Sequence, residues 1–177
     1  VTFQPRSSLH VDHNQFQASG VHITTTDPGG TTTFSNNSVV AEEVGEAILT
    51  ITAGTLVEVL ENDFQQLGTT SPNDLALDVV AAGPLTLNVL ANEFVNLGRA
   101  LGLYSDGLQF TADINDNTFD FPITYLPAAA LVAALNSAQM ALDLNDNRWG
   151  QVTTMDELLG YMFVYGDESS ALSLELT

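Results

Sequence analysis

The order of apolar and polar residues predicts a chain built mainly from short β-strands. Apolar and β-branched residues alternate with polar ones in short runs, and Gly, Pro or Asn-Asp turns separate the runs at intervals of about ten residues. This rhythm is typical of a β-sandwich or a barrel. The predicted strands are two runs that flank Gly54 within 47–62, followed by 75–82, 84–90, 108–113, 119–126 and 171–176.

Two segments have a helical pattern instead. In 127–142, Pro127 suits a first helical turn, and apolar residues recur at helical spacing. In 153–163, Thr153 or Thr154 can cap a short helix whose first turn holds two acids, where the helix dipole favours negative charge. We therefore predict one or two short helices. The apolar face of the first would contain Leu131, Leu135 and Ala138.

The segment 87–101 fits both periods. Steps of three and four between its large apolar residues favour a helix, whereas the alternation that begins at Leu85 favours a strand. A strand that runs into a helix satisfies both patterns. The residues at helical spacing are Leu87, Leu90, Phe94, Leu97 and Leu101.

Two pairs of segments resemble each other at the same offset of 30 residues. VEVLENDFQQLG at 57–68 resembles LNVLANEFVNLG at 87–98, and DINDN at 113–117 resembles DLNDN at 143–147. A true duplication would give two similar strand-turn units. Because β-rich chains reuse the same turn residues, we interpret the resemblance as shared turn chemistry.

The first forty residues are rich in Thr, Ser, Asn and Gly. Within them, the turn sequence Asp27-Pro28-Gly29-Gly30 lies between β-branched runs. This pattern predicts a hairpin or an extended N-terminal arm over 1–40. The length of 177 residues fits a single domain over 1–177.

The charge balance limits the partners that the chain can bind. It has 3 Lys+Arg against 22 Asp+Glu, a formal net charge of −19, and no lysine. Such a surface repels phosphate backbones, so we expect no direct binding of nucleic acid. The charge indicates adaptation to high salt, because at 1 M salt the Debye length falls to about 3 Å and carboxylates repel each other little. The absence of cysteine excludes disulfides and thiolate metal sites.

Two acidic loops have the spacing of a calcium ligand set. Asp113-x-Asn115-x-Asn117 and Asp143-x-Asn145-x-Asn147 place oxygens at positions 1, 3 and 5 of a calcium loop. The glycine of position 6 and the glutamate of position 12 are missing from both. The alternative is an Asx-rich turn between strands. Whether Asp113–Asn117 and Asp143–Asn147 bind calcium stays open at this point.

The histidines and other reactive residues form no catalytic pattern. His10, His13 and His22 lie early, and LHVDH at 9–13 matches only part of a hydrolase metal signature, so we expect a polar N-terminal arm there. The chain has no G-x-S-x-G, no P-loop and no dinucleotide-binding glycines. We interpret the acid pairs Glu42-Glu43 and Asp156-Glu157 as solvated faces. We therefore predict no enzyme, no catalytic residue, no metal site and no cofactor.

The chain resembles the smaller single jelly-roll major capsid proteins of membrane-containing icosahedral viruses that infect haloarchaea. The resemblance lies in the acidic, lysine-free composition, the strand rhythm and the stretch 119–147. It implies a mainly β, single jelly-roll sandwich or barrel that stands upright in the capsid shell of the virion. It further implies oligomers with itself and with a second, larger jelly-roll capsid protein, above an internal membrane that this chain does not span.

The alternative function is a secreted or cell-surface β-sandwich module of a halophile that binds glycan or calcium. Trp149, Tyr161 and Tyr165 could stack on sugar rings, although such aromatic residues are more often core or subunit contacts. In this alternative, Trp149 and Tyr161 would act together with the two Asp-Asn loops.

Overall fold

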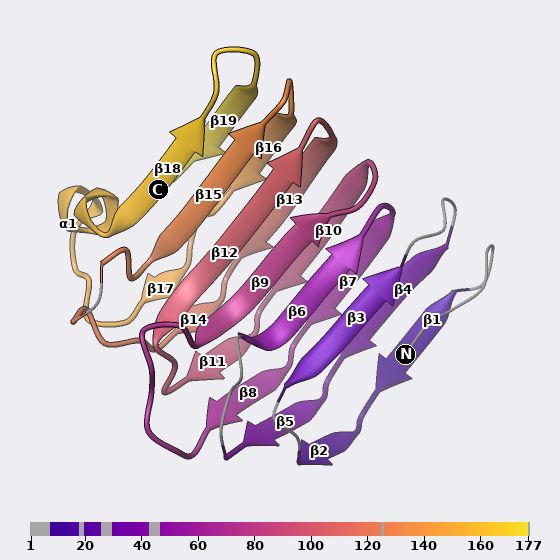
Figure 1. Cartoon of the computed structure of the whole chain (residues 1–177). Coiled ribbons are helices and arrows are strands. Elements are labelled where there is room, and N and C mark those ends of the chain that lie inside the picture. Colours follow the sequence, from indigo (N-terminus) through magenta and orange to yellow (C-terminus); the bar gives the residue numbers. More distant parts are fainter. Residues whose placement is uncertain (1–7, 18–19, 26–29, 43–46, 125, 177) are drawn as a thin grey trace.

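The computed structural model describes residues 8–17, 20–25, 30–42, 47–124 and 126–176. The chain winds as a parallel β-solenoid of about five turns with 59% strand (Figure 1). Consecutive strands lie in three different sheets, and each strand pairs in parallel with strands of the neighbouring turns. The expectation of a mainly β chain is confirmed. The single jelly-roll sandwich or barrel is wrong, because a jelly roll is built from antiparallel strands.

We name the three sheets A, B and C. Sheet A contains β3 (Val21–Thr25), β6 (Ala47–Ala53), β9 (Leu75–Ala81), β12 (Arg99–Asp106), β15 (Ala130–Leu135) and β18 (Met162–Gly166). Sheet B contains β1 (Leu9–Asp12), β4 (Thr31–Ser35), β7 (Leu56–Leu60), β10 (Leu85–Leu90), β13 (Gln109–Asn115), β16 (Gln139–Asp143) and β19 (Ala171–Glu175). Sheet C contains β2 (Gln15–Gln17), β5 (Ser38–Ala41), β8 (Asp63–Gln66), β11 (Glu93–Val95), β14 (Thr118–Phe119) and β17 (Arg148–Trp149).

The alternating pattern places successive side chains on the inside and the outside of each turn of the solenoid. In β10, Leu87 and Val89 are fully buried, whereas Asn88 between them lies on the outer face. Parallel pairing in register then places like residues above one another: Val59 pairs with Val89, and Val89 pairs with Ile114. The core is therefore a set of stacked apolar rows enclosed by three sheets.

A ladder of asparagines lies at the corner between sheets B and C. In each turn one residue with positive φ, such as Glu61 or Ala91, bends the chain, and an asparagine follows it. Asn62 Oδ1 accepts the backbone N–H of Asn37 at 2.8 Å, and Asn92 Oδ1 accepts that of Asn62 at 2.9 Å. Every described turn repeats this bond, which satisfies buried backbone groups. The ladder contains Asn14, Asn37, Asn62, Asn92, Asn117 and Asn147.

An aromatic stack follows the ladder two residues further along each turn. The ring centroids of Phe64 and Phe94 lie 4.7 Å apart, those of Phe94 and Phe119 lie 5.0 Å apart, and those of Phe119 and Trp149 lie 5.1 Å apart. The planes of the first pair differ by only 6°, so these rings stack face to face along the solenoid. The spacing matches the distance of about 4.8 Å between neighbouring strands.

The prediction of a helix over 127–142 is wrong. This segment forms β15 and β16, joined by a turn in which Asn136 and Ser137 have positive φ. Ala130, Val132 and Ala134 point inside and are buried, so the segment follows the period of a strand. The alanines of this segment are compatible with a helix and with a strand, so they did not contradict a helical face. The spacing of Leu131 and Leu135 alone then favoured the helix.

The helix over 153–163 is confirmed with narrower bounds, as α1 (Met155–Gly160). Thr154 is its N-cap, and the Thr154 hydroxyl accepts the backbone N–H of Glu157 at 3.2 Å. Leu158 of α1 is buried against the core. Within the described parts of the chain, no helix has the length and apolar character needed to cross a bilayer.

Two further expectations are corrected. The segment 87–101 contains no helix, because it passes through β10, β11 and the start of β12. Two sharp corners between these strands interrupt the alternation of the apolar residues, and their spacing therefore also matched a helical period. The N-terminal segment is neither a hairpin nor an arm over the residues that are described. β1 to β3 form a turn of the solenoid, and β3 and β4 belong to different sheets. Asp27, Pro28 and Gly29 lie outside the described residues.

Candidate binding site

The outer face of sheet A differs from turn to turn. One row runs across all six strands in register, and its members change from polar to apolar along the solenoid. This variation contrasts with the repeated asparagines and aromatic rings on the inside. In order, the row contains His22, Thr50, Asp78, Gly102, Leu131 and Phe163.

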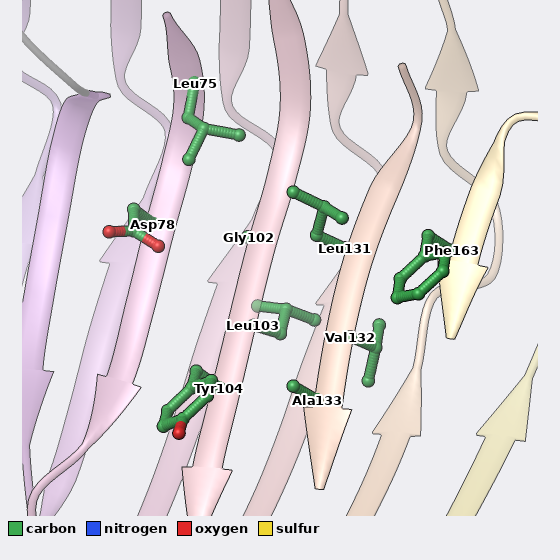
Figure 2. A pocket seen from close by; sticks show the side chains of 9 residues that line it. All are labelled: Leu75, Asp78, Gly102, Leu103, Tyr104, Leu131, Val132, Ala133 and Phe163. Carbon is green, nitrogen blue, oxygen red and sulfur yellow. The ribbon is translucent and has the colours of Figure 1, made fainter. Parts of the chain in front are cut away.

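A hollow of about 290 Å³ opens on this face at Gly102 (Figure 2). A Cβ atom at position 102 would lie 2.8 Å from Asp78 Oδ1 and 3.1 Å from Leu75 Cδ1, so the side chains of β9 already cover the glycine and a larger residue would displace them. Leu75 and Asp78 come from β9, whereas Leu131 and Phe163 come from β15 and β18. The walls are therefore apolar, with one carboxylate at the rim.

Tyr104 and Phe163 line the hollow, and Tyr165 follows Phe163 by two residues on the same face of β18. The side chain of Tyr104 is 37% exposed, that of Phe163 is 53% exposed and that of Tyr165 is 49% exposed. Tyr104 pairs with Ala133, and Ala133 pairs with Tyr165. A small side chain thus separates two tyrosines on the same face, and we call this arrangement the tyrosine slot. Exposed aromatic residues beside an apolar hollow are typical of a ligand-binding surface.

The outer face of sheet B presents a row of acids. Parallel pairing places Asp113 beside Asp143, and Asp143 beside Glu175. Like charges in neighbouring positions of a sheet repel each other, and salt screens that repulsion. Among the described residues, no three His, Asp or Glu side chains lie close enough together to hold a metal ion. Salt therefore weakens the repulsion within this row.

The Asp-Asn loops do not form calcium loops. Asn117 and Asn147 belong to the inner ladder, where Asn147 Oδ1 accepts the backbone N–H of Asn117 at 2.9 Å. The Nδ2 group of Asn115 donates to Asp113 Oδ1 within the first loop. Because the third oxygen of each loop is turned inward, the positions 1, 3 and 5 do not converge on one point. The Asx-turn alternative describes the observed geometry.

The predicted aromatic platform is not assembled. Trp149 is 7% exposed and ends the internal stack, and Tyr161 packs half-buried against the core. Of these three residues, only Tyr165 lies on the outer face of sheet A, where it pairs with Ala133 and not with Trp149 or Tyr161. The acids Asp156 and Glu157 lie in the first turn of α1, and Glu42 is exposed. Glu43 lies outside the described residues.

The three histidines are dispersed over the first turn of the solenoid. His10 lies on β1, His13 lies at the first corner and His22 lies on the outer face of β3. His13 Nδ1 lies 2.6 Å from Asp12 Oδ2, and this hydrogen bond is the main cause that lowers the pKa of the Asp12 carboxyl. His10 and His13 lie near the Asp12 carboxylate, and His22 lies apart from them on another sheet, so the three do not form a common site.

Sequence reasoning did not find the residues of the hollow and the tyrosine slot. Gly102, Ala133 and Tyr104 match no motif, and their proximity depends on the register between turns. A signal for that register was present. The pattern of asparagine, any residue and then an aromatic or apolar residue occurs at Asn14, Asn37, Asn62, Asn92, Asn117 and Asn147. Aligning these six copies shows the repeat, but the register of the outer strands needs gaps as well, because 75–81, 99–106 and 130–135 begin 13, 7 and 13 residues after their asparagines.

The fold defines the chain as a parallel β-solenoid with an apolar hollow on the outside of sheet A. Comparisons with protein-family models, with curated proteins and with solved structures found no match.

Proposed function

We propose that the protein is a saccharide-binding β-solenoid module adapted to high salt. In this proposal, a neutral sugar ring binds on the outer face of sheet A between Tyr104 and Tyr165. The observation that carries the proposal is the tyrosine slot, in which Ala133 separates two exposed tyrosines in register.

The width of the tyrosine slot suits a flat ring. Two strand spacings of about 4.8 Å put the backbones of β12 and β18 about 9.6 Å apart. Two stacked rings place their centroids about 4.5 to 5 Å apart at their closest. A sugar ring between two tyrosine rings therefore needs about twice that distance, which is close to the separation of the two backbones. A larger side chain in place of Ala133 would fill this space.

The surface next to the tyrosine slot suits the C–H face of a sugar ring, because the hollow that Tyr104 lines is almost entirely apolar. The net charge of −19 disfavours acidic sugars, so the ligand class is a neutral saccharide.

Calorimetric titration with neutral oligosaccharides, including cellotriose and chitotriose, tests the proposal. We expect saturable binding in about 1 M KCl. A double substitution, Tyr104→Ala with Tyr165→Ala, should weaken binding at least about tenfold. Leu126→Ala is the matched control, because Leu126 is 68% exposed and lies outside the hollow and the tyrosine slot. An absence of saturable heat with every neutral saccharide contradicts the proposal.

A second candidate is a shell protein whose copies associate with each other and with a partner in high salt. One observation favours it: β18 lies at the edge of sheet A, with Phe163 and Val164 53% and 45% exposed. Open strand edges with apolar side chains pair with other chains, and salt screens the repulsion between acidic copies. Light scattering should then show association that grows with salt and reverses on dilution. A monomer at every salt concentration contradicts this candidate.

A further inference from the structure

The tyrosine slot has an aromatic wall on each side of a small floor. Tyr104 lies on β12 and Tyr165 lies on β18, and Ala133 of β15 lies between them in the same register row. Figure 2 shows Tyr104 and Ala133 on their neighbouring strands. Because both tyrosines are exposed and Ala133 ends in a methyl group, a sugar ring that enters from the solvent has an aromatic ring against each of its two faces.

The two faces of such a ring meet no hydrogen-bonding group in the tyrosine slot. The faces of Tyr104 and Tyr165 are aromatic carbon, and the hollow that Tyr104 lines is almost entirely apolar. The perimeter of the ring stays in contact with water above the sheet. A hydroxyl in the plane of the ring therefore keeps its hydrogen bonds, whereas a hydroxyl that stands on a face loses them without replacement.

The direction of the hydroxyls on a pyranose chair decides which case applies. Equatorial hydroxyls lie close to the plane of the ring and leave both faces to C–H groups, whereas an axial hydroxyl stands on one face. All hydroxyls of a β-linked glucose unit are equatorial, but mannose and galactose units each have one axial hydroxyl. A single aromatic wall accepts all three sugars, because the ring can turn its axial hydroxyl away from that wall. Two walls leave no such choice.

We propose that the tyrosine slot selects neutral sugars whose ring substituents are all equatorial, the gluco configuration, and rejects sugars with an axial hydroxyl. This inference rests on the proposed saccharide-binding function and names its ligand class. Tyr104 and Tyr165 determine the specificity together, because an axial hydroxyl would lie against one of them without a partner. A hydrophobic pocket rejects an added hydroxyl by up to about a hundredfold. Units of N-acetylglucosamine belong to the accepted class, since their acetamido group is equatorial.

The test compares three neutral trimers with the same β-linkage by calorimetry on the full chain: cellotriose, mannotriose and galactotriose, which contain glucose, mannose and galactose. In about 1 M KCl, we expect cellotriose to bind at least about tenfold more tightly than either of the other two. Tyr165→Ala should reduce this preference to about threefold or less, because the ring can turn its axial hydroxyl toward the side that has lost its wall. Tyr165→Phe is the matched control, since it retains the aromatic wall and should retain the full preference.

Tyr104→Ala opens the opposite wall and provides a second variant, in case Tyr165→Ala at the edge strand β18 weakens the fold. It should reduce the preference for cellotriose in the same way. Equal affinity of the unaltered protein for the three trimers, full preference in both alanine variants, or loss of preference in Tyr165→Phe overturns the inference and leaves the proposed function standing. Failure of every neutral saccharide to bind overturns both.

Discussion

The inner corner and the outer face of the same solenoid follow opposite rules. At the corner between sheets B and C, each turn repeats the same chemistry: an asparagine in the ladder, then an aromatic or apolar residue in the stack. On the outer face of sheet A, the row that contains Asp78, Gly102 and Leu131 changes at each turn. Repetition inside holds the turns together, whereas variation outside gives each part of the outer face its own chemistry, as the proposed binding of a specific ligand requires.

The difference follows from what each position must satisfy. A buried amide has to find a partner in the next turn, and an identical amide one strand away provides it at the same distance every time. An outer side chain has water as a partner, so the fold places few limits on it. We therefore expect substitutions inside to lower the stability of folding and substitutions outside to change binding.

The largest effect should come from the aromatic stack. Phe94 is fully buried between Phe64 and Phe119, so Phe94→Ala removes contacts on both faces of the ring. We expect a loss of about 3 to 5 kcal/mol in the free energy of unfolding, measured by urea denaturation in high salt. Val95→Ala, at the next residue on the outer face of β11, should cost far less. A similar cost for both would contradict the comparison.

The asparagine ladder should give the next largest effect. Asn92 Oδ1 accepts the backbone N–H of Asn62 at 2.9 Å, and Asn92 Nδ2 donates to the carbonyl oxygen of Val59 at 2.8 Å. Asn92→Ala leaves these buried groups without partners, at a cost of about 2 to 4 kcal/mol. Asn88→Ala, on the outer face of β10, is the control, and the same denaturation experiment measures both. If Asn92→Ala is as stable to urea as Asn88→Ala, the ladder does not contribute to the free energy of unfolding.

Filling the tyrosine slot should separate binding from stability. Ala133 lies between Tyr104 and Tyr165, so Ala133→Leu places a branched side chain where the sugar ring would sit. We expect saccharide affinity to fall at least about tenfold, which is about 1.4 kcal/mol, with the urea midpoint nearly unchanged. Calorimetry and denaturation on the same sample measure the two quantities. Unchanged affinity would place the ligand elsewhere.

The acidic row on sheet B should respond to salt. Asp143 lies between Asp113 and Glu175 in parallel register, so Asp143→Asn removes repulsion on both sides. We expect a gain of about 0.5 kcal/mol at low salt that disappears near 1 M KCl, where the Debye length is about 3 Å. Urea denaturation at both salt concentrations measures the difference. A gain that persists in high salt would mean that charge is not its cause.

The smallest effect concerns the turn between β18 and β19. Hydrogen bonds from the Ser170 hydroxyl, from the backbone N–H of Asn136 and from Ser169 lower the pKa of Asp167 to about 2. A depressed pKa in the folded state means that the stabilisation is present above pH 3.8 and is lost as the pH falls toward 2. The amide resonance of Asn136 should follow this titration, and Asp167→Asn should abolish it. A titration that survives in Asp167→Asn belongs to another group.

Strand positions could be predicted from the sequence, but their arrangement could not. The runs at 75–82, 84–90, 108–113 and 171–176 correspond to β9, β10, β13 and β19. Alternation reports which residues face inside, and it is the same in an antiparallel sandwich and in a parallel solenoid. The predicted strand at 119–126 was wrong beyond Phe119, because β14 ends there. Only the repeat distinguishes the two folds.

The repeat was visible and was misinterpreted. Phe64 and Phe94 occupy equivalent places in the echo of 30 residues, and in the structure they stack on each other. The next interval is shorter, 25 residues from Asn92 to Asn117, and this variation in loop length concealed the period. The proposed binding surface depends on register across turns, so it could not be predicted without the repeat.

The most direct test of the saccharide-binding proposal is a map of amide chemical shifts during titration with chitotriose in high salt. The proposal predicts that the shifts concentrate on the outer face of sheet A, at Gly102, Ala133 and Tyr165, and saturate together. Saturating shifts centred on sheet B or on the corner of the asparagine ladder, with sheet A unchanged, would contradict it.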